Sequence, residues 1–193
     1  MSWFSRFFFV VVAFLAVLGL WTEQGCTRRG GSGGSAPPTA APQTTFYVNP
    51  VKGNDTTGNG EATTPFKSIT RALVAVSKST ATGLTISLSS GTYTAASGEV
   101  FPIVIPVTVS ISGTIPVGRR SFSFISGYGE DKALETALGA PAGSYFTTVA
   151  VPSSVSAALN NVYVGSQTVN LKGGRYDALD VLGSVQVSHG NLG

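Results

Sequence analysis

The sequence predicts an all-β fold, and three observations lead to this prediction. Charged residues make up only 11% of the 193 residues, whereas soluble domains usually have about 25%. Glycine alone contributes 24 residues, and together with serine, threonine and valine it favours short strands joined by turns. Beyond residue 83, the chain consists of short alternating or apolar runs that Gly, Pro and Ser interrupt.

The expected strands are short and closely spaced. They cover residues 46–48, 84–88, 103–105, 107–111, 122–125, 146–151, 159–164, 168–171, 179–182 and 185–187. Residues 90–93 read as a turn, and phrases such as Ser110-Ile-Ser-Gly113 suggest a strand that ends in a tight corner. This pattern admits a sandwich, a barrel or a β-solenoid.

One amphipathic helix interrupts the strands. Thr64 suits the N-cap and Pro65 the first helical position. Spacings of three and four residues place one apolar face on the helix, and Gly83 closes the segment. The apolar face comprises Phe66, Ile69, Ala72, Leu73 and Val76.

A dense turn cluster at residues 52–60 precedes this helix. Asp55, Asn54 and Asn59 suggest two interpretations, a calcium loop or turn chemistry in which the Asx side chains bind nearby backbone. The spacing and the closing glutamate of an EF-hand are absent. The sequence therefore favours turn chemistry and predicts no metal site and no cofactor.

The first residues predict export. Arg6 precedes an uninterrupted apolar run at residues 7–21, which is typical of a secretory signal. The run is at the short end for a membrane anchor, which needs about 20 apolar residues. We expect a targeting segment at residues 1–26, a flexible Gly/Ser/Pro-rich linker at 27–45, and one domain at 46–193.

The single cysteine, Cys26, follows the apolar run directly, and it excludes an intrachain disulfide. The segment Glu23-Gln24-Gly25-Cys26 resembles a bacterial lipoprotein signal, which implies lipidation of Cys26. Glu23 and Gln24 depart from that pattern, which has an aliphatic and a small residue there. An uncleaved signal anchor and ordinary signal cleavage remain the alternatives. All of these possibilities imply export. We therefore expect the chain in the cell envelope, anchored to the membrane by the Cys26 lipid or by the N-terminal segment, or alternatively secreted.

The region from Phe46 to Gly113 resembles a bacterial family called domain of unknown function 1565, within the pectate-lyase-like parallel β-helix proteins. The resemblance covers about a third of the chain. The residues that carry it are Tyr47-Val48-Asn49-Pro50, Gly53-Asn54-Asp55, Thr64-Pro65-Phe66-Lys67-Ser68-Ile69-Thr70-Arg71-Ala72-Leu73, Ser90-Gly91-Thr92-Tyr93 and Gly98-Glu99-Val100-Phe101-Pro102.

The resemblance implies a short right-handed parallel β-helix whose N-terminal end is capped by the amphipathic helix. Since the chain stops after a strand-corner phrase, at Asn191-Leu192-Gly193, we expect a truncated or naturally shortened member of the family. A stack that continues through a partner chain is the other possibility, and the sequence does not predict the oligomeric state.

Catalytic residues are not predicted. Glu130 and Asp131 are adjacent, which favours a solvated turn, and the spacing of Asp177 and Asp180 places them on opposite faces of a strand. His189, in Ser188-His189-Gly190, resembles the glycine-flanked histidine of polygalacturonases. The paired aspartates and the Arg-x-Lys of that family are missing, which favours a histidine at a surface corner. The cations of Arg28-Arg29 and Arg119-Arg120 are isolated pairs away from aromatic clusters, so nucleic acid is not an expected partner.

The expected function is that of a structural or glycan-binding surface module of unknown biochemical activity. Its partners would be the membrane and a polysaccharide that stacks on exposed rings. The candidate rings are Tyr93, Tyr128, Tyr145, Tyr163 and Tyr176. The alternative is a polysaccharide lyase or glycoside hydrolase, which requires at least two carboxylates and a base that converge on one face. The sequence favours a protein that is not an enzyme.

Overall fold

The computed structural model describes residues 41–114, 122–165, 175–188 and 191–192. Their helices and strands are β1 (Thr45–Val48), α1 (Ile69–Val76), β2 (Thr85–Leu88), β3 (Gly91–Tyr93), η1 (Ala95–Ser97), β4 (Ile103–Val104), β5 (Val109–Gly113), β6 (Ser123–Ser126), β7 (Gly129–Glu130), α2 (Lys132–Leu138), β8 (Tyr145–Val151), β9 (Ser156–Asn160), β10 (Val162–Gly165), β11 (Arg175–Val181), β12 (Ser184–Ser188) and β13 (Asn191–Leu192). Strands dominate the described residues, so the prediction of an all-β fold is confirmed.

The strands form three sheets. Sheet A has the order β1-β2-β5-β9-β12, sheet B the order β13-β10-β6-β3, and sheet C the order β11-β8-β4. The pairings in these orders are all parallel, and the small strand β7 pairs antiparallel with β8. Two neighbouring parallel strands must be joined by a crossover connection. Here that connection runs through strands of the other two sheets.

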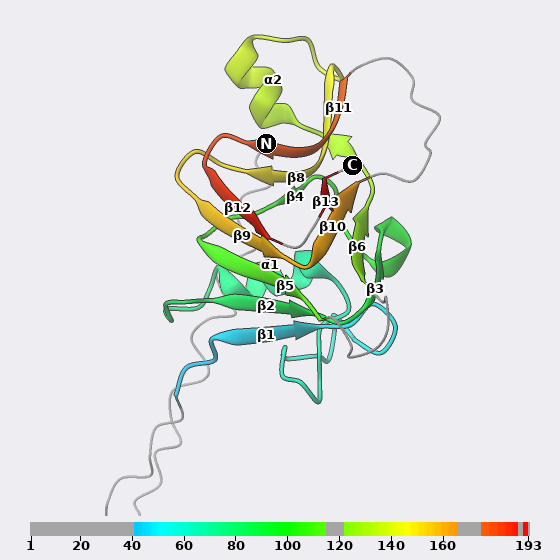
Figure 1. The fold of residues 1–193 in the computed structure, drawn as a ribbon, viewed down its shortest axis with the longest axis vertical. Helices are drawn as coiled ribbons and strands as arrows, with labels where there is room; N and C mark the ends of the chain where they lie inside the picture. Colours follow the sequence, from blue (N-terminus) through cyan, green and yellow to red (C-terminus); the bar gives the residue numbers. More distant parts are fainter. Residues whose placement is uncertain (1–40, 115–121, 166–174, 189–190, 193) are drawn as a thin grey trace, which may run out of the picture. The chain divides into compact units, whose positions relative to one another are not determined.

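Successive strands enter the sheets in a fixed order. The chain passes from β2 in sheet A to β3 in sheet B and β4 in sheet C, and then returns to β5 beside β2 (Figure 1). The same circuit repeats through β5, β6 and β8, and again through β9, β10 and β11. Strands β12 and β13 begin a fourth circuit. We call each circuit a coil.

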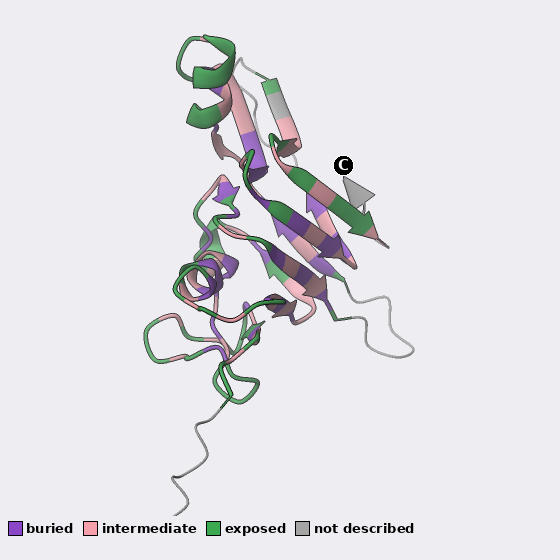
Figure 2. Cartoon of the chain, turned by 90° about the vertical axis from the view of Figure 1, so that its left-hand side faces the viewer, coloured by how far each residue is buried: buried purple, intermediate pink, exposed green. Residues whose placement is uncertain are grey.

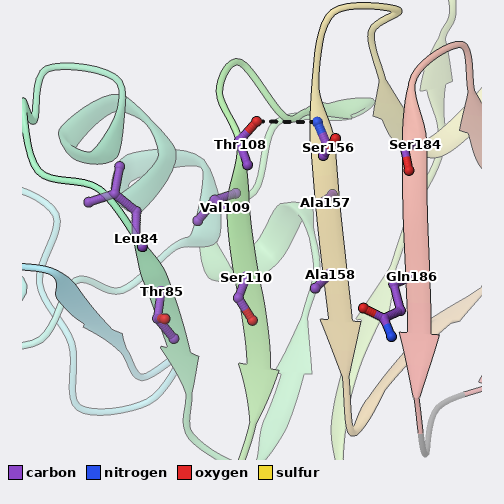
Figure 3. A pocket seen from close by; sticks show the side chains of 11 residues that line it. Leu84, Thr85, Thr108, Val109, Ser110, Ser156, Ala157, Ala158, Ser184 and Gln186 are labelled. Carbon is purple, nitrogen blue, oxygen red and sulfur yellow. Dashed lines mark hydrogen bonds between the residues drawn. The ribbon is translucent and has the colours of Figure 1, made fainter.

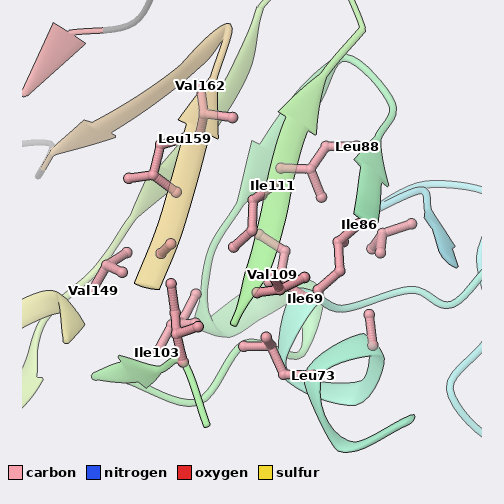
Figure 4. Close-up of a cluster of buried hydrophobic side chains, with 14 of the residues drawn as sticks. Ile69, Leu73, Ile86, Leu88, Ile103, Val109, Ile111, Val149, Leu159 and Val162 are labelled. Carbon is pink, nitrogen blue, oxygen red and sulfur yellow. The ribbon is translucent and has the colours of Figure 1, made fainter. Parts of the chain in front are cut away.

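The apolar core lies inside the coils. In sheet A, the register places Phe46, Ile86, Ile111 and Leu159 in one row across β1, β2, β5 and β9. Each of these side chains is at most 6% exposed. Side chains from the other sheets, such as Val149 of β8, belong to the same cluster, and Figure 4 shows how they point toward one another. Full burial of such a side chain stabilises the fold by about 1.5–3 kcal/mol.

Helix α1 contributes its apolar face to this core, as predicted, but it begins later than predicted. Ile69 and Leu73 join the cluster that contains the sheet A row (Figure 4). The N-cap is Ser68, whose Oγ accepts a hydrogen bond from the Arg71 amide at 3.1 Å. Pro65 is not in the helix, because Phe66 stays extended and bridges Val48 in parallel.

The corner between sheets A and B divides one predicted strand into two. Residues 159–164 were expected to be a single strand, whereas the structure has β9 and β10 on either side of Asn161. Asn161 has a φ of 55°, and Asn adopts this left-handed conformation more readily than most residues. Residues 90–93, expected to be a turn, contain strand β3, which pairs with β6.

A second helix, α2, lies between β7 and β8 and was not predicted. Asp131 is its N-cap, with Oδ1 accepting a hydrogen bond from the Leu134 amide at 3.0 Å, and Gly139 ends it with a φ of 63°. Much of α2 is exposed (Figure 2). The prediction of a solvated turn at Glu130 and Asp131 is wrong for Asp131, which caps the helix and is only 1% exposed.

The predicted targeting segment, Cys26, most of the linker and His189 lie outside the described residues. Strand β1 begins at Thr45, one position before the predicted start of the domain. Within the part of the chain that the structure describes, neither helix has the length and apolar character needed to cross a membrane.

Candidate functional site

The outward face of sheet A carries two rows of side chains, of which all but Ala158 are polar. The strand register aligns the members of each row across β1, β2, β5, β9 and β12. The first row is Thr45, Thr85, Ser110, Ala158 and Gln186, and the second row is Tyr47, Ser87, Ser112, Asn160 and Ser188. We call these ten residues the polar face. None of them is charged.

Alternation along the strands produces this face. Residues that alternate with Ile86 on β2 and with Ile111 on β5 must point away from the core, because successive side chains lie on opposite faces of a sheet. The burial pattern agrees, with buried and half-buried residues alternating along both strands. Small hydroxyl side chains at the outward positions keep the face flat and polar.

The polar face contains a shallow groove of about 370 Å³. Figure 3 shows the side chains of Thr85, Ser110 and Gln186 along it, with Thr108 and Ser156 at one end. The Ser156 amide donates a hydrogen bond to Thr108 Oγ1 at 3.4 Å. The groove therefore offers hydroxyl and amide groups without a fixed charge, beside the apolar residues Leu84, Val109, Ala157 and Ala158.

Hydrogen bonds link neighbouring strands across the same face. Asn160 Nδ2 donates to Ser110 Oγ at 3.1 Å, and Ser188 Oγ donates to Asn160 Oδ1 at 2.5 Å. These bonds hold the Asn160 side chain in one orientation. A ligand would therefore meet a polar surface that is already ordered, which lowers the entropy cost of binding.

The predicted tyrosine rings do not form one exposed row. Tyr93 is 0% exposed, and its hydroxyl donates to the Ser89 carbonyl at 2.8 Å. Burial, with a smaller contribution from the charge of Glu99, raises the pKa of Tyr93. The prediction of an exposed ring is thus wrong for Tyr93, which is part of the core. Tyr163 is half-buried and packs edge-on against Phe122, with ring centroids 4.7 Å apart.

Among the remaining rings, Tyr128 and Tyr145 are half-buried, and the side chain of Tyr176 lies outside the described residues. The sequence analysis missed Tyr47, which is 39% exposed and belongs to the polar face. Its place after Phe46 in an alternating strand was the available signal, since Phe46 points inward.

The turn cluster before α1 uses its polar side chains as predicted. Asn54 Oδ1 accepts hydrogen bonds from the amides of Thr56 and Thr57. Asp55 Oδ1 accepts from the amides of Lys67 and Ser68 at 2.7 and 3.0 Å. Turn chemistry is therefore confirmed for Asn54, whereas Asp55 binds backbone groups 12 and 13 residues away. The described residues contain no group of three or more His, Cys, Asp or Glu side chains placed to hold a metal ion.

Glu99 is a buried carboxylate for which the sequence predicted no role. It is 4% exposed, and it accepts hydrogen bonds from the Ile69 amide at 2.7 Å and the Thr70 amide at 2.9 Å. Burial raises the pKa of Glu99, although the hydrogen bonds from Thr70 and Ile69 act in the opposite direction. Glu99 therefore holds the first turn of α1 against the coils, which is a structural role.

A second hollow, of about 470 Å³, lies where α2 begins beside sheet C. Glu130, Asp131 and Asp180 line it together with Lys132. The sequence analysis did not expect this convergence, because Asp131 and Asp180 are far apart in the chain. The register of β11 on β8 places Asp180 beside Ala150. The pairing of β7 with β8, and the hydrogen bond from the Asp131 amide to the Tyr145 carbonyl at 2.9 Å, hold Asp131 beside the same sheet, and both acids line the hollow.

The carboxyl groups of Asp131 and Asp180 influence each other. Burial raises the pKa of Asp180, and the charge of Asp131 raises it further. Two carboxyl groups that face each other can form a hydrogen bond only when one of them is protonated. Asp177 is engaged elsewhere, because its Oδ2 lies 2.9 Å from Arg175 Nε.

The described residues thus define an all-β protein of parallel sheets, with an uncharged polar face on one sheet and a carboxylate-lined hollow at another. A family model described as "Protein of unknown function (DUF1565)" matches residues 51–175, well over half of the chain. The chain belongs to this family, as the resemblance predicts. No curated protein matches the chain.

Proposed function

We propose that this chain is an exported cell-envelope protein that displays a right-handed parallel β-helix and binds a neutral glycan on its polar face. The fixed order in which the chain visits sheets A, B and C supports the β-helix. The burial of Ile69 and Leu73 in the core at the first coils supports a capping role for α1. The superfamily assignment to the pectate-lyase-like proteins belongs to the same proposal.

The polar face is the observation that carries the glycan-binding function. Neutral sugars present many hydroxyl groups and no charge, so they pair well with a surface of Ser, Thr, Asn and Gln side chains. The absence of charge on these ten residues disfavours acidic polysaccharides, which cationic side chains would bind. Tyr47, partly exposed at the β1 end, adds a ring on which a sugar could stack.

The test is a glycan array probed with the full chain and with the variants Ser110→Lys and Ser112→Lys. Each variant places a long, charged side chain on the flat face, and we expect at least a tenfold loss of binding to neutral glycans. Thr57→Lys is the matched control, since Thr57 is exposed in the turn cluster and is not one of the ten residues of the polar face. Retained binding by both sheet variants, or no bound glycan, would reject the proposal.

Export and lipidation have a separate test. Mass spectrometry of the full chain from the membrane fraction of a bacterial host is expected to show a diacylglyceryl adduct on Cys26. Cys26→Ser should lose the adduct and leave the membrane fraction if the lipid is the anchor. An intact N-terminus in the membrane fraction would instead identify the apolar run at residues 7–21 as the anchor.

The alternative, a polysaccharide lyase or glycoside hydrolase, takes its support from the carboxylates of the second hollow. Against it, the rest of the lining of this hollow is mostly apolar. Lys132 is the candidate base in this hollow, while Asp131 is already engaged as the N-cap of α2. An assay for new reducing ends on polygalacturonate and on neutral glycans decides the matter: activity that Asp131→Asn abolishes would establish the enzyme.

A further inference from the structure

The hollow beside α2 contains a buried carboxylate oxygen that lacks a donor. Asp131 is 1% exposed, and although its Oδ1 caps α2, its Oδ2 has no hydrogen-bond donor among the described residues. A buried carboxylate oxygen without a donor is costly, and most such atoms in native proteins have a partner. Asp180, the polar group that faces it, is itself an acid.

The walls of the hollow are mostly apolar. Besides the acids and Lys132, they consist of Ala, Val, Leu, Pro and Ser side chains, among them Ala133, Ala150, Val151 and Leu182. The volume of about 470 Å³ is within the range of about 300–1,000 Å³ that is usual for small-molecule sites. The hollow therefore combines an acidic end with an apolar wall.

This combination selects a class of ligand. A hard metal ion such as Ca²⁺ takes six to eight oxygen ligands, and the described residues provide no cluster of that kind. A neutral sugar would bring no counter-charge to the Asp131 carboxylate. An ammonium or guanidinium group satisfies both conditions, because it donates several hydrogen bonds and carries the opposite charge.

We propose that the hollow binds a small organic cation, an ammonium or guanidinium group on an apolar stem, with Asp131 and Asp180 as its counter-charges. The stem lies against Ala133, Ala150 and Leu182. This inference does not depend on the glycan-binding function, since the polar face lies on sheet A and the hollow lies beside sheet C.

The charges around the site make binding depend on pH. Glu130 and Lys132 line the same hollow, and Asp177 acts on Asp180 from the same strand. The cation requires an ionised Asp180, whose pKa is raised mainly by burial and then by Asp131. Affinity should therefore fall as the pH is lowered through this raised pKa.

The experiment is an NMR titration of the full chain at neutral pH with three probes that share one stem: butylammonium, 1-butanol and butyrate. We expect butylammonium to shift the amide signals of Ala133 and Ala150, with an affinity at least tenfold above that of butanol and no binding of butyrate. Equal affinities for butylammonium and butanol would show an apolar hollow only and would overturn the proposal.

Variants separate the acids from the fold. Asp131→Asn and Asp180→Asn should each weaken butylammonium at least tenfold, while Lys132→Gln should strengthen it severalfold. Asp180→Asn leaves the α2 cap intact, so it tests the site even if Asp131→Asn is unstable. Glu61→Gln removes the same charge from an exposed position and should change nothing. Unchanged affinity in Asp180→Asn, or displacement of butylammonium by stoichiometric Ca²⁺, would refute the organic-cation site.

Discussion

Glu99 follows Ile69 by 30 residues, and yet its carboxylate is the acceptor for the first amides of α1. The same carboxylate accepts a hydrogen bond from the Thr70 hydroxyl at 2.8 Å. The Asp55 carboxylate likewise accepts hydrogen bonds from the amides of Lys67 and Ser68, the two residues before the helix. Residues that carry the family resemblance therefore build the junction between the turn cluster, the helix and the coils.

Replacement of this acceptor tests its role. Glu99→Gln keeps the size of the side chain but places an amide N–H group where a carboxylate oxygen accepted hydrogen bonds from the α1 amides. This change should lower the free energy of unfolding by about 2 kcal/mol. Urea denaturation of the full chain measures the effect. Glu61→Gln, at an exposed glutamate, should stay within about 0.5 kcal/mol of the parent. An equal effect of the two variants would contradict the role of Glu99.

Sequence reasoning recovered some residue roles and missed others for a physical reason. The Asx turns of Asn54 and Asn59 were predictable because their partners lie within three residues. The role of Glu99 and the convergence of Asp131 with Asp180 depend on contacts between distant segments. A single sequence does not reveal which distant segments the coils bring together.

The start of α1 is decided by competition between two local preferences. Thr64 and Pro65 carry a good helix-start signal, but Phe66 instead donates its amide hydrogen bond to the Tyr47 carbonyl at 3.0 Å. Gly53 fits closely beneath this segment, because a Cβ there would lie 2.1 Å from the Phe66 carbonyl oxygen. Tertiary pairing with β1 thus delays the helix until Ser68.

This start can be located by mutation. Ser68→Ala removes the N-cap acceptor and should lower the free energy of unfolding by about 1 kcal/mol. Thr63→Ala, at an exposed position before the helix, should change it by less than about 0.5 kcal/mol. Hydrogen exchange at the Arg71 amide, the donor to Ser68 Oγ, is expected to accelerate only in Ser68→Ala. Unchanged exchange there would place the cap elsewhere.

The three sheets could not be derived from periodicity alone. Strand positions were predictable from alternation and turn residues, which is why most predicted strands lie close to observed ones. The coils differ in length, however, since one of them includes β7 and α2 between β6 and β8. This irregular spacing hides the repeat, so the sequence alone left a sandwich and a barrel open.

One core that runs through the coils implies that they unfold together. Ile111 is 1% exposed and lies in the row between Ile86 and Leu159. Ile111→Ala should lower the free energy of unfolding by about 2–5 kcal/mol and should accelerate hydrogen exchange in β2, β5 and β9 alike. Val104→Ala, at a residue that is 49% exposed, is the control, with an expected change near zero. Loss of protection confined to β5 would indicate separately folding coils.

The excursion through α2 leaves the stacking of sheet C undisturbed. Val149 still pairs with Ile103 on one side and with Leu179 on the other. At the outer turn of the excursion, a Cβ atom added to Gly139 or Gly143 would meet no described neighbouring atom within 4 Å. A foreign peptide could therefore be grafted between these glycines, which would make the protein a scaffold for presenting epitopes or fluorescent tags.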